Sequence, residues 1–262
     1  MHIVVCVKQV HDPEVAPALF TINEATNAVV SVAGLAQVIS PYDEQAIEAA
    51  LRMKDKKPDT KITVLTIGAA SAREVLKHAL SMGADEAILV NISAGVLLDS
   101  YATAKFLHEA VNKIGSFDLI LAGRQSADLD AGVVGNGLAE LLHIPAITFA
   151  KRIEVVESKV VVDRVVDNGS EKIETTLPAL ITVSNEIGAA RKPNLRETMR
   201  ASRKPTQSWT QADLSKEPME ATEELIKLFI PKKEKHCEFL AGTSAAEQAS
   251  LLVRKLRDAR LI

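Results

Sequence analysis

DLILAGRQSADLDAGVVGNGLAELL, residues 118–142, is the most informative stretch of the sequence. Its apolar start, residues 119–121, predicts a buried strand, and a polar loop follows that strand. A helix is predicted next, with Ala131, Gly132 and Gly135 in its first turn. The unpaired N–H groups of such a turn, together with the helix dipole, favour a phosphate at the carboxyl edge of a parallel sheet. The stretch is therefore predicted to hold a nucleotide phosphate, although its spacing matches neither GxGxxG nor GxxxxGKS/T.

Strands and helices alternate before this stretch. Ser40 is a suitable N-cap with Pro41 at the first helical position, and Ser71 is expected to cap the following helix. Such alternation is typical of βαβ units, so the predicted fold class is α/β, with an open, mostly parallel, doubly wound, Rossmann-like sheet. The predicted strands are residues 3–7, 28–32, 61–67 and 87–90, and the predicted helices are residues 41–54, 71–80 and 99–114.

The pattern changes after Pro145. Between residues 147 and 183 the sequence has β-rich runs, RIEVV, KVVVDRVV and LPALITV, with an Asp-Asn-Gly-Ser turn at residues 167–170. No helical period is present there. These runs are predicted to be antiparallel strands that extend or flank the parallel sheet.

Regular patterning fades at residues 185–218, where a short helix is expected at residues 196–201. Residues 244–256 predict an amphipathic helix with Ser244 as its cap. Because this helix follows a long linker, its apolar stripe must pack on its own sheet or on a partner chain.

The composition excludes several classes of protein. The 262 residues are 47% hydrophobic and 25% charged, which is typical of a soluble globular protein, and only 3% are aromatic, which favours an aliphatic core. A net charge of −3 argues against a nucleic-acid-binding protein. Two cysteines are too few for a disulfide framework, and no apolar run is long enough for a membrane span. A cytoplasmic protein that is not embedded in a membrane is expected.

No catalytic constellation stands out. Asp128 and Asp130 are interpreted as capping and loop-shaping residues in preference to a cation site or an acid–base pair. Arg124 suits a phosphate and a surface salt bridge equally, and Cys6 is interpreted as a core residue. Neither a catalytic residue nor a metal ligand is assigned, since GxSxG, HExxH and CxxC are absent from the sequence. A nucleotide site without catalytic machinery indicates a carrier or a binding subunit.

Several segments match one known family in sequence and in order. They include VVCVKQVHDP at residues 4–13, SPYDEQAIEAALRMK at 40–54, DLILAGRQSADLDAGVVG at 118–135, DRVVDNGSEKIETTLPALITVSNEIGAARKPNLRETMRASRKP at 163–205 and LAGTSAAEQASLLVRKL at 240–256. Through them the chain resembles the beta subunit of electron transfer flavoproteins over nearly its whole length. The resemblance implies an adenine-nucleotide hydrolase-like α/β fold with antiparallel additions and a C-terminal helical arm.

The resemblance implies an electron carrier rather than a classical enzyme. In this family an alpha subunit holds most of the redox-active FAD, and the beta subunit buries either AMP or a second FAD. The Pro13 turn would approach the flavin of the alpha subunit. The residues implied for the nucleotide pocket are Cys6, Ser40, Pro41, Tyr42, Asp43, Ile67, Gly123, Arg124, Gln125, Ser126, Ala127, Asp128, Leu129, Asp130, Ala131, Gly132, Val133 and Val134.

A partner-recognition loop is implied at residues 183–205. Its anchoring leucine would be Leu195, with Arg191, Asn194 and Arg196 beside it. The transient partner would be an acyl-CoA dehydrogenase or a related flavoprotein, which would place the chain in fatty acid oxidation. Without the resemblance, Leu195 would be expected to pack inward under the loop.

Two domains are expected. Residues 1–184 would form the adenine-nucleotide-binding α/β domain. Residues 185–262 would form the recognition loop, the linker and an arm that embraces the alpha subunit in a heterodimer.

Two other functions stay open. In flavin-bifurcating members a second FAD in the beta subunit oxidises NADH; such members often carry Gly-Asp-Thr where this chain has Leu129, Asp130 and Ala131, and AMP and FAD both remain candidates. A stand-alone ATP-binding regulatory protein, similar to the universal stress proteins, is the alternative from another class. The long tail at residues 185–262 counts against it.

Overall fold

The structure is a computed structural model that describes residues 1–262 except 31, 94–95, 97, 217–218 and 232–236. Its helices are α1 (Pro41–Lys56), α2 (Arg73–Met82), α3 (Ser100–Ile114), α4 (Val134–Leu141), α5 (Leu195–Ala201), α6 (Gln211–Leu214) and α7 (Ala245–Asp258). Its longer strands are β1 (His2–Cys6), β6 (Lys61–Gly68), β7 (Glu86–Asn91), β8 (Leu119–Gly123), β9 (Ala146–Val156), β10 (Lys159–Val166), β11 (Gly169–Thr176), β12 (Ala179–Val183) and β13 (Thr206–Thr210). Short strands are β2 (Gln9–His11), β3 (Ile22–Asn23), β4 (Ala28–Val29) and β5 (Gln37–Ile39), and short 3-10 turns are η1 (Pro17–Leu19), η2 (Ala70–Ala72) and η3 (Asn185–Ile187).

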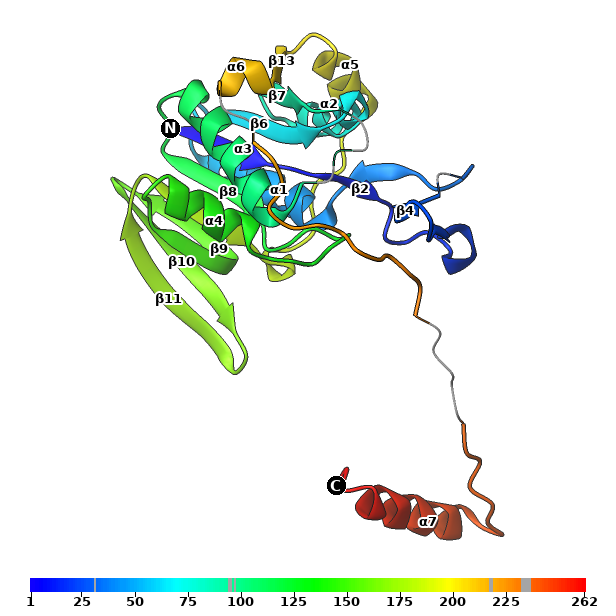
Figure 1. Ribbon diagram of the computed structural model, residues 1–262. Helices are drawn as coiled ribbons and strands as arrows, with labels where there is room; N and C mark the ends of the chain where they lie inside the picture. Colours follow the sequence, from blue (N-terminus) through cyan, green and yellow to red (C-terminus); the bar gives the residue numbers. More distant parts are fainter. Residues whose placement is uncertain (31, 94–95, 97, 217–218, 232–236) are drawn as a thin grey trace.

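The longer strands form one sheet in the order β11-β10-β9-β12-β8-β1-β6-β7-β13 (Figure 1). From β9 to β13 in this order, each strand pairs in parallel with the next one. In the middle of the sheet, Ile3 of β1 lies between Ile62 of β6 and Leu119 of β8. The predicted fold class, an open and mostly parallel α/β sheet, is confirmed.

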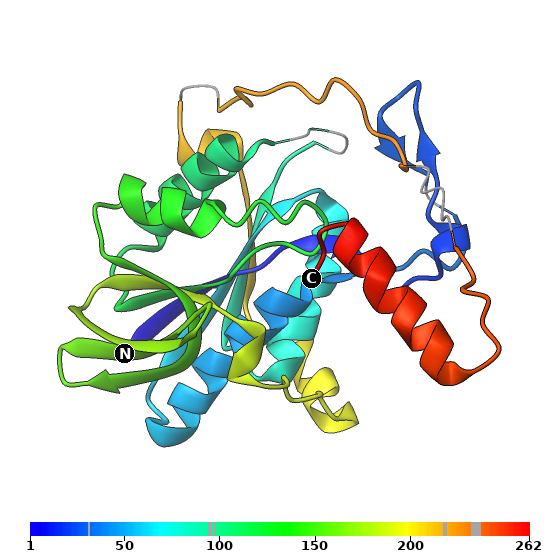
Figure 2. The same ribbon diagram turned by 90° about the horizontal axis from the view of Figure 1, so that it is seen from below.

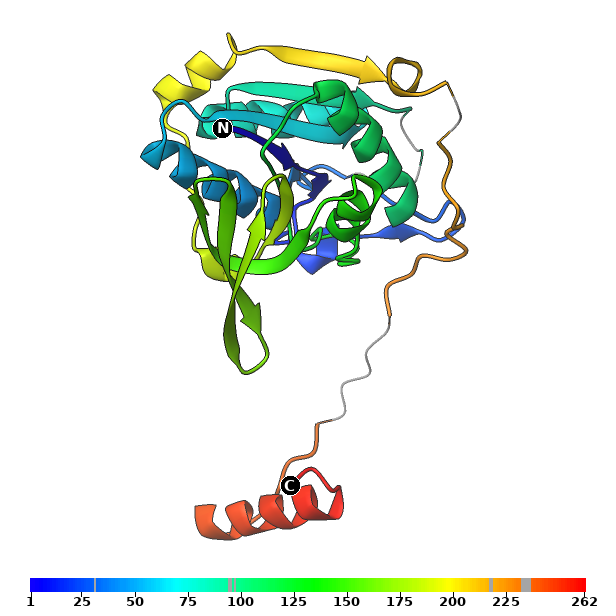
Figure 3. The same ribbon diagram turned by 90° about the vertical axis from the view of Figure 1, so that its left-hand side faces the viewer.

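Helices cover both faces of this sheet. Ile3 and Val5 of β1 pack in the core formed with α1 and α2, whereas Val4 and Cys6 pack in the core formed with α3 and α4. Figures 2 and 3 show the two layers of helices with the sheet between them. Because both faces are covered, β1 is a continuous apolar run instead of an alternating one.

The predicted antiparallel extension is confirmed for β9 and β10, and β11 continues it. The prediction was wrong for the run LPALITV. It forms β12, which lies between β9 and β8 and is parallel to both. All five residues of β12 are buried, as expected of a strand inside a parallel sheet.

Other predictions at the ends of elements were also wrong. Ser71 does not cap α2; its hydroxyl donates to Gln9 Oε1 at 2.9 Å. Helix α4 begins at Val134, so Ala131 and Gly132 lie before it, and Gly132 has a φ of 67° that a helix does not permit. The prediction of fading structure at residues 185–218 missed β13, which extends the sheet beside β7.

The described part of the linker that follows α6 contacts the domain formed by the nine-stranded sheet and its helices through Met219, which is buried in the core with α3 and α4, and through hydrogen bonds to Asp99 and Asn27. Asp99, the N-cap of α3, accepts hydrogen bonds from the backbone N–H groups of Thr222 and Glu223. Asn27 Nδ2 donates to the carbonyl of Ile226 at 2.9 Å, and its Oδ1 accepts from Leu228 N–H at 3.0 Å.

Helix α7 lies apart from the sheet domain (Figures 1 and 3). Its predicted cap is confirmed, because Ser244 Oγ accepts a hydrogen bond from the N–H of Glu247. On its apolar stripe, Leu252 is 47% and Val253 40% exposed.

Candidate functional site

The carboxyl ends of β1, β8 and β12 meet the start of α1 at one edge of the sheet. From β1 the chain passes through α1 to β6 on one side, whereas β8 pairs with the other side of β1. The strand order therefore reverses between β1 and β8. Ligands of open α/β sheets bind in the crevice at such a switch point.

A cleft of about 480 Å³ lies at this edge. It is lined by six residues that the sequence analysis named, Pro13, Pro41, Tyr42, Arg124, Ala127 and Asp130, and by two that it missed, Gln45 and Asn185. Gln45 stands one turn after Pro41 on α1, and this spacing could have revealed it. Asn185 follows β12, and it was overlooked because β12 was not recognised as a parallel strand ending here.

Asp43 joins the first turn of α1 to two neighbouring strands. Its Oδ2 accepts from the N–H of Lys8, after β1, at 2.8 Å, and its Oδ1 accepts from the N–H of Gly123, at the end of β8, at 3.0 Å. Burial raises the pKa of Asp43 to about 7, although the two backbone hydrogen bonds and the Lys8 cation lower it. A Cβ on Gly123 would lie 2.5 Å from Asp43 Oδ1, so only glycine fits at this crossing.

Lys8, which was not predicted, links the loop between β8 and α4 to the carboxyl end of β1. Its Nζ lies 2.7 Å from Asp128 Oδ2. Burial would raise the pKa of Asp128, but the hydrogen bonds from Lys8 and Ser126 hold it below its ordinary value. Asp128 is therefore a loop-shaping carboxylate, as the sequence interpretation favoured.

The guanidinium of Arg124 lies near two aromatic rings. It is 5.1 Å from the ring centre of Tyr42 and 5.7 Å from that of Phe149, and its Nη1 donates to Asn185 Oδ1 at 3.2 Å. Phe149 has a φ of 58°, a conformation that a bulky side chain seldom adopts. These contacts hold the cation at the wall of the cleft.

The loop between β8 and α4 is shaped by its own polar groups. The N–H of Asp130 donates to the carbonyl of Ser126 at 3.0 Å, and Gln125 Nε2 donates to Asp130 Oδ1 at 2.8 Å. Asp130 and Gly132 have positive φ values of 51° and 67°. The loop leaves Leu129, Ala131 and Val133 exposed and leads into α4 at the partly buried Val134.

Cys6 and Ile67 lie inside the domain, next to this edge. Burial raises the pKa of the Cys6 thiol to about 12, with a smaller contribution from Asp43, so the thiol stays protonated and packs in the core. Ile67 is partly buried and packs against the same core. Their side chains offer a ligand mainly apolar contact, with the thiol of Cys6 as a weak donor.

Three of the six buried side-chain polar atoms that form no hydrogen bond in the described residues belong to this edge, and the others are His11 Nδ1, Thr60 Oγ1 and Arg164 Nε. Among the described residues, Ser40 Oγ, Gln45 Oε1 and Arg124 Nε are buried and form no hydrogen bond. Ser40 occupies the N-cap position of α1, but its hydroxyl does not cap the helix, so that expectation was wrong. Such atoms are costly unless a ligand or water satisfies them. Donors, acceptors and a cation in one cleft fit a phosphorylated, hydrogen-bonding ligand such as an adenine nucleotide.

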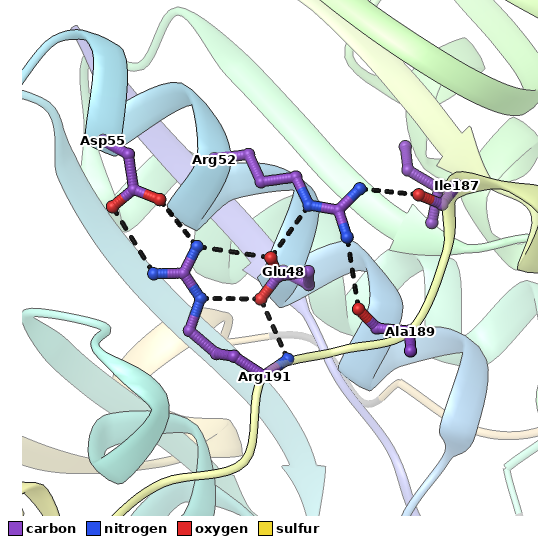
Figure 4. Close-up of polar contacts among 6 residues, drawn as sticks. All are labelled: Glu48, Arg52, Asp55, Ile187, Ala189 and Arg191. Atoms are coloured by element: carbon purple, nitrogen blue, oxygen red, sulfur yellow. Dashed lines mark hydrogen bonds and ion pairs between the residues drawn. The ribbon is translucent and has the colours of Figure 1, made fainter.

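The predicted recognition residues lie on a separate surface. Leu195 is 78% exposed at the start of α5, which excludes the expectation that it packs inward. Asn194 caps α5 by accepting from the N–H of Glu197 at 2.9 Å, and Arg196 is exposed. Arg191 is bound instead to Glu48 and Asp55 of α1 (Figure 4).

Within the described ranges, no group of three or more His, Cys, Asp and Glu side chains is arranged to hold a metal ion. No helix in the described part of the chain has the length and apolar character needed to cross a membrane.

Together, the fold and the cleft define a doubly wound α/β protein with a candidate ligand site at its switch point and an exposed C-terminal helix. The model of the electron transfer flavoprotein domain matches residues 27–214. The chain belongs to the electron transfer flavoprotein family and, within it, to the beta subunits.

Three relatives illustrate this membership. The electron transfer flavoprotein subunit beta of Bacillus subtilis is 38% identical over 228 residues, covering 86% of this chain and 88% of that protein. Subunit CarD of the caffeyl-CoA reductase-Etf complex of Acetobacterium woodii is 33% identical over 267 residues, covering 100% of each. Protein FixA of Azotobacter vinelandii is 36% identical over 215 residues, covering 80% of this chain and 74% of that protein. The predicted resemblance is confirmed, and the alternative of a protein similar to the universal stress proteins is not supported.

Proposed function

We propose that this chain is the beta subunit of a heterodimeric electron transfer flavoprotein, which relays electrons between the FAD of the complex and acyl-CoA dehydrogenase-type flavoproteins or other redox partners. The observation that carries the proposal is the cleft at the switch point, with its unpaired polar atoms, in a chain of this family. The flavin supplies the redox chemistry, so the protein contributes position and environment.

The nucleotide of this chain is proposed to be AMP or a second FAD. The loop from Gly123 to Val134 would hold its phosphate, because the loop contains the positive-φ Gly132 and ends at the first turn of α4. Arg124, Ser40 and Gln45 would supply the charge and the hydrogen bonds that their unpaired atoms offer. A second FAD would make this the subunit that oxidises NADH in a bifurcating complex; Ala131, which lacks a hydroxyl, favours AMP.

The alpha subunit is proposed to bind the C-terminal arm. In the described structure, the apolar stripe of α7, which includes Leu252 and Val253, is exposed to solvent. An amphipathic helix gains stability by covering such a stripe. The long linker allows α7 to reach a second chain, which supports a heterodimer.

A transient partner is proposed to bind α5. Leu195 and Met199, 78% and 66% exposed, stand one turn apart on the same helix. An apolar anchor amid weaker polar contacts suits a short-lived electron-transfer complex. The dehydrogenase would meet the heterodimer here.

The cytoplasm is the proposed location. Cys6 is buried, Cys237 is exposed, and neither forms a disulfide, as expected in a reducing compartment.

Co-expression with a cognate alpha subunit tests the proposed function. The expected product is a yellow heterodimer that accepts electrons from an acyl-CoA dehydrogenase reduced with butyryl-CoA. Failure to form an FAD-containing heterodimer would contradict the proposal.

A further inference from the structure

The side chain of Glu48, on α1, is 6% exposed and is surrounded by donors (Figure 4). It accepts from Arg52 Nε at 2.8 Å. From Arg191 it accepts three hydrogen bonds, from the backbone N–H at 3.1 Å, from Nε at 2.8 Å and from Nη2 at 3.2 Å. Truncating this buried carboxylate leaves several half-buried donors unpaired.

The two arginines extend these contacts along the segment that follows η3. Arg52 donates to the carbonyl of Ile187 at 2.6 Å and to that of Ala189 at 3.1 Å. Arg191 also binds Asp55, which lies about two turns beyond Glu48 on α1, at 2.7 Å. Helix α1 therefore holds residues 187–191 by their backbone and by one side chain, as Figure 4 shows.

The other end of the exposed surface is also fixed. Lys204 donates to the carbonyls of Leu80 and Ala84, at the end of α2, at 2.8 and 2.7 Å. Between Arg191 and Lys204 lies α5, which carries Leu195. The segment is therefore a short bridge with both ends anchored on helices of the sheet domain.

We propose that Glu48, Arg52 and Arg191 are positioning residues for partner docking, holding the 187–191 segment on α1 so that α5 presents Leu195 and Met199 in a preformed arrangement. This inference rests on the proposed function. A preformed surface loses less conformational entropy on binding than a mobile one, so the anchor strengthens docking without touching the partner. Because α1 also begins at the cleft, the anchor fixes the docking surface relative to the nucleotide site.

The variant Glu48→Gln in the intact heterodimer tests this inference. With an acyl-CoA dehydrogenase reduced by butyryl-CoA, the KM for the dehydrogenase is expected to rise about threefold to tenfold, with kcat and FAD content unchanged. Amide hydrogen exchange is expected to accelerate at residues 187–201 and to stay unchanged in β1. Arg191→Lys keeps the charge and loses the forked contact, so its KM and exchange should lie between those of the wild type and Arg191→Ala.

The matched control is Glu174→Gln, which makes the same change in an exposed pair with Lys159, on the β10–β11 hairpin. It should change neither KM nor exchange at residues 187–201. The inference is overturned if Glu48→Gln leaves both measurements unchanged, or if KM, kcat and FAD content change together through a general loss of the fold. If the wild-type heterodimer accepts no electrons from the dehydrogenase, the proposed function fails, and hydrogen exchange alone still decides whether Glu48 holds the segment.

Discussion

At the scale of single residues, Asp43 has the most constrained environment in the candidate site. Its carboxylate joins backbone groups of Lys8 and Gly123 while remaining 6% exposed. In such a place burial raises the pKa of a carboxyl group, whereas hydrogen bonds to its ionised form lower that pKa. Desolvation prevails, because the pKa rises to about 7 from an ordinary 3.8. The site edge therefore changes its charge near neutral pH.

This shift predicts how the free energy of unfolding depends on pH. Between pH 4 and pH 7 the folded chain binds more protons at Asp43 than the unfolded chain, so this carboxyl stabilises the fold at low pH and loses that effect as pH rises to about 7. Asp43→Asn removes the titration. Between pH 5 and pH 8 the free energy of unfolding of the wild type should therefore fall by about 2–3 kcal/mol relative to that of the variant. Urea unfolding at several pH values measures this, and equal pH slopes for the two proteins would show that Asp43 does not titrate in this range.

At the scale of elements, most helices and strands could be predicted, because the sequence shows the apolar periodicity of each. Pro41 at the start of α1 and Ser244 before α7 are local signals that the structure confirms, whereas Asp99, predicted as the first residue of a helix, is the N-cap of α3. Strand direction could not be predicted in the same way. β12 and the antiparallel strands are all rich in β-branched residues, so their composition does not distinguish them. The direction of β12 follows from its place in the sheet, between β9 and β8.

The polar part of the site was also harder to predict. Lys8, Gln45 and Asn185 come from separate elements or loops, as does the apolar Phe149 beside Arg124, and no local motif unites them. The charge cluster around Glu48 joins residues more than a hundred positions apart in sequence. Such contacts depend on tertiary packing, which a pattern within one segment does not encode.

The attachment of the linker gives a prediction at this scale. Asn27 donates to Leu225 and Ile226 and accepts from Leu228, so Asn27→Asp removes the donors while preserving tolerance of its φ of 48°. Amide exchange at residues 225–228 should accelerate about tenfold. Asn23→Asp is the control, because Asn23 Oδ1 accepts from Ala25 within the same hairpin. Equal exchange at residues 225–228 in the two variants would mean that Asn27 does not hold the linker.

At the scale of the whole molecule, three features lie on one chain: a ligand cleft, an anchored helix α5 and an outlying helix α7. The three features lie at different places in the structure. The cleft lies at the carboxyl edge of the sheet, α5 is bound through α1 and α2, and α7 lies apart from the sheet domain (Figure 1). The division at residues 184 and 185 remains a prediction, and β13 places part of the second segment against the first.

The exposed stripe of α7 predicts how the subunits associate. Replacing Leu252 and Val253 by serine removes two apolar side chains from the proposed interface. The dissociation constant of the heterodimer should rise about tenfold or more. Arg254→Ser on the same helix is the control and should bind nearly as the wild type does. Sedimentation of mixed subunits measures this, and an unchanged constant in the double variant would exclude α7 from the interface.

The most direct test of the central claim, a nucleotide-binding beta subunit, is the number of nucleotides in the purified heterodimer. Release by denaturation, followed by chromatography, counts FAD and AMP for each pair of subunits. Two adenine nucleotides are expected, one FAD in the alpha subunit together with one AMP or a second FAD in this chain. A heterodimer that contains a single FAD and no other nucleotide would contradict it.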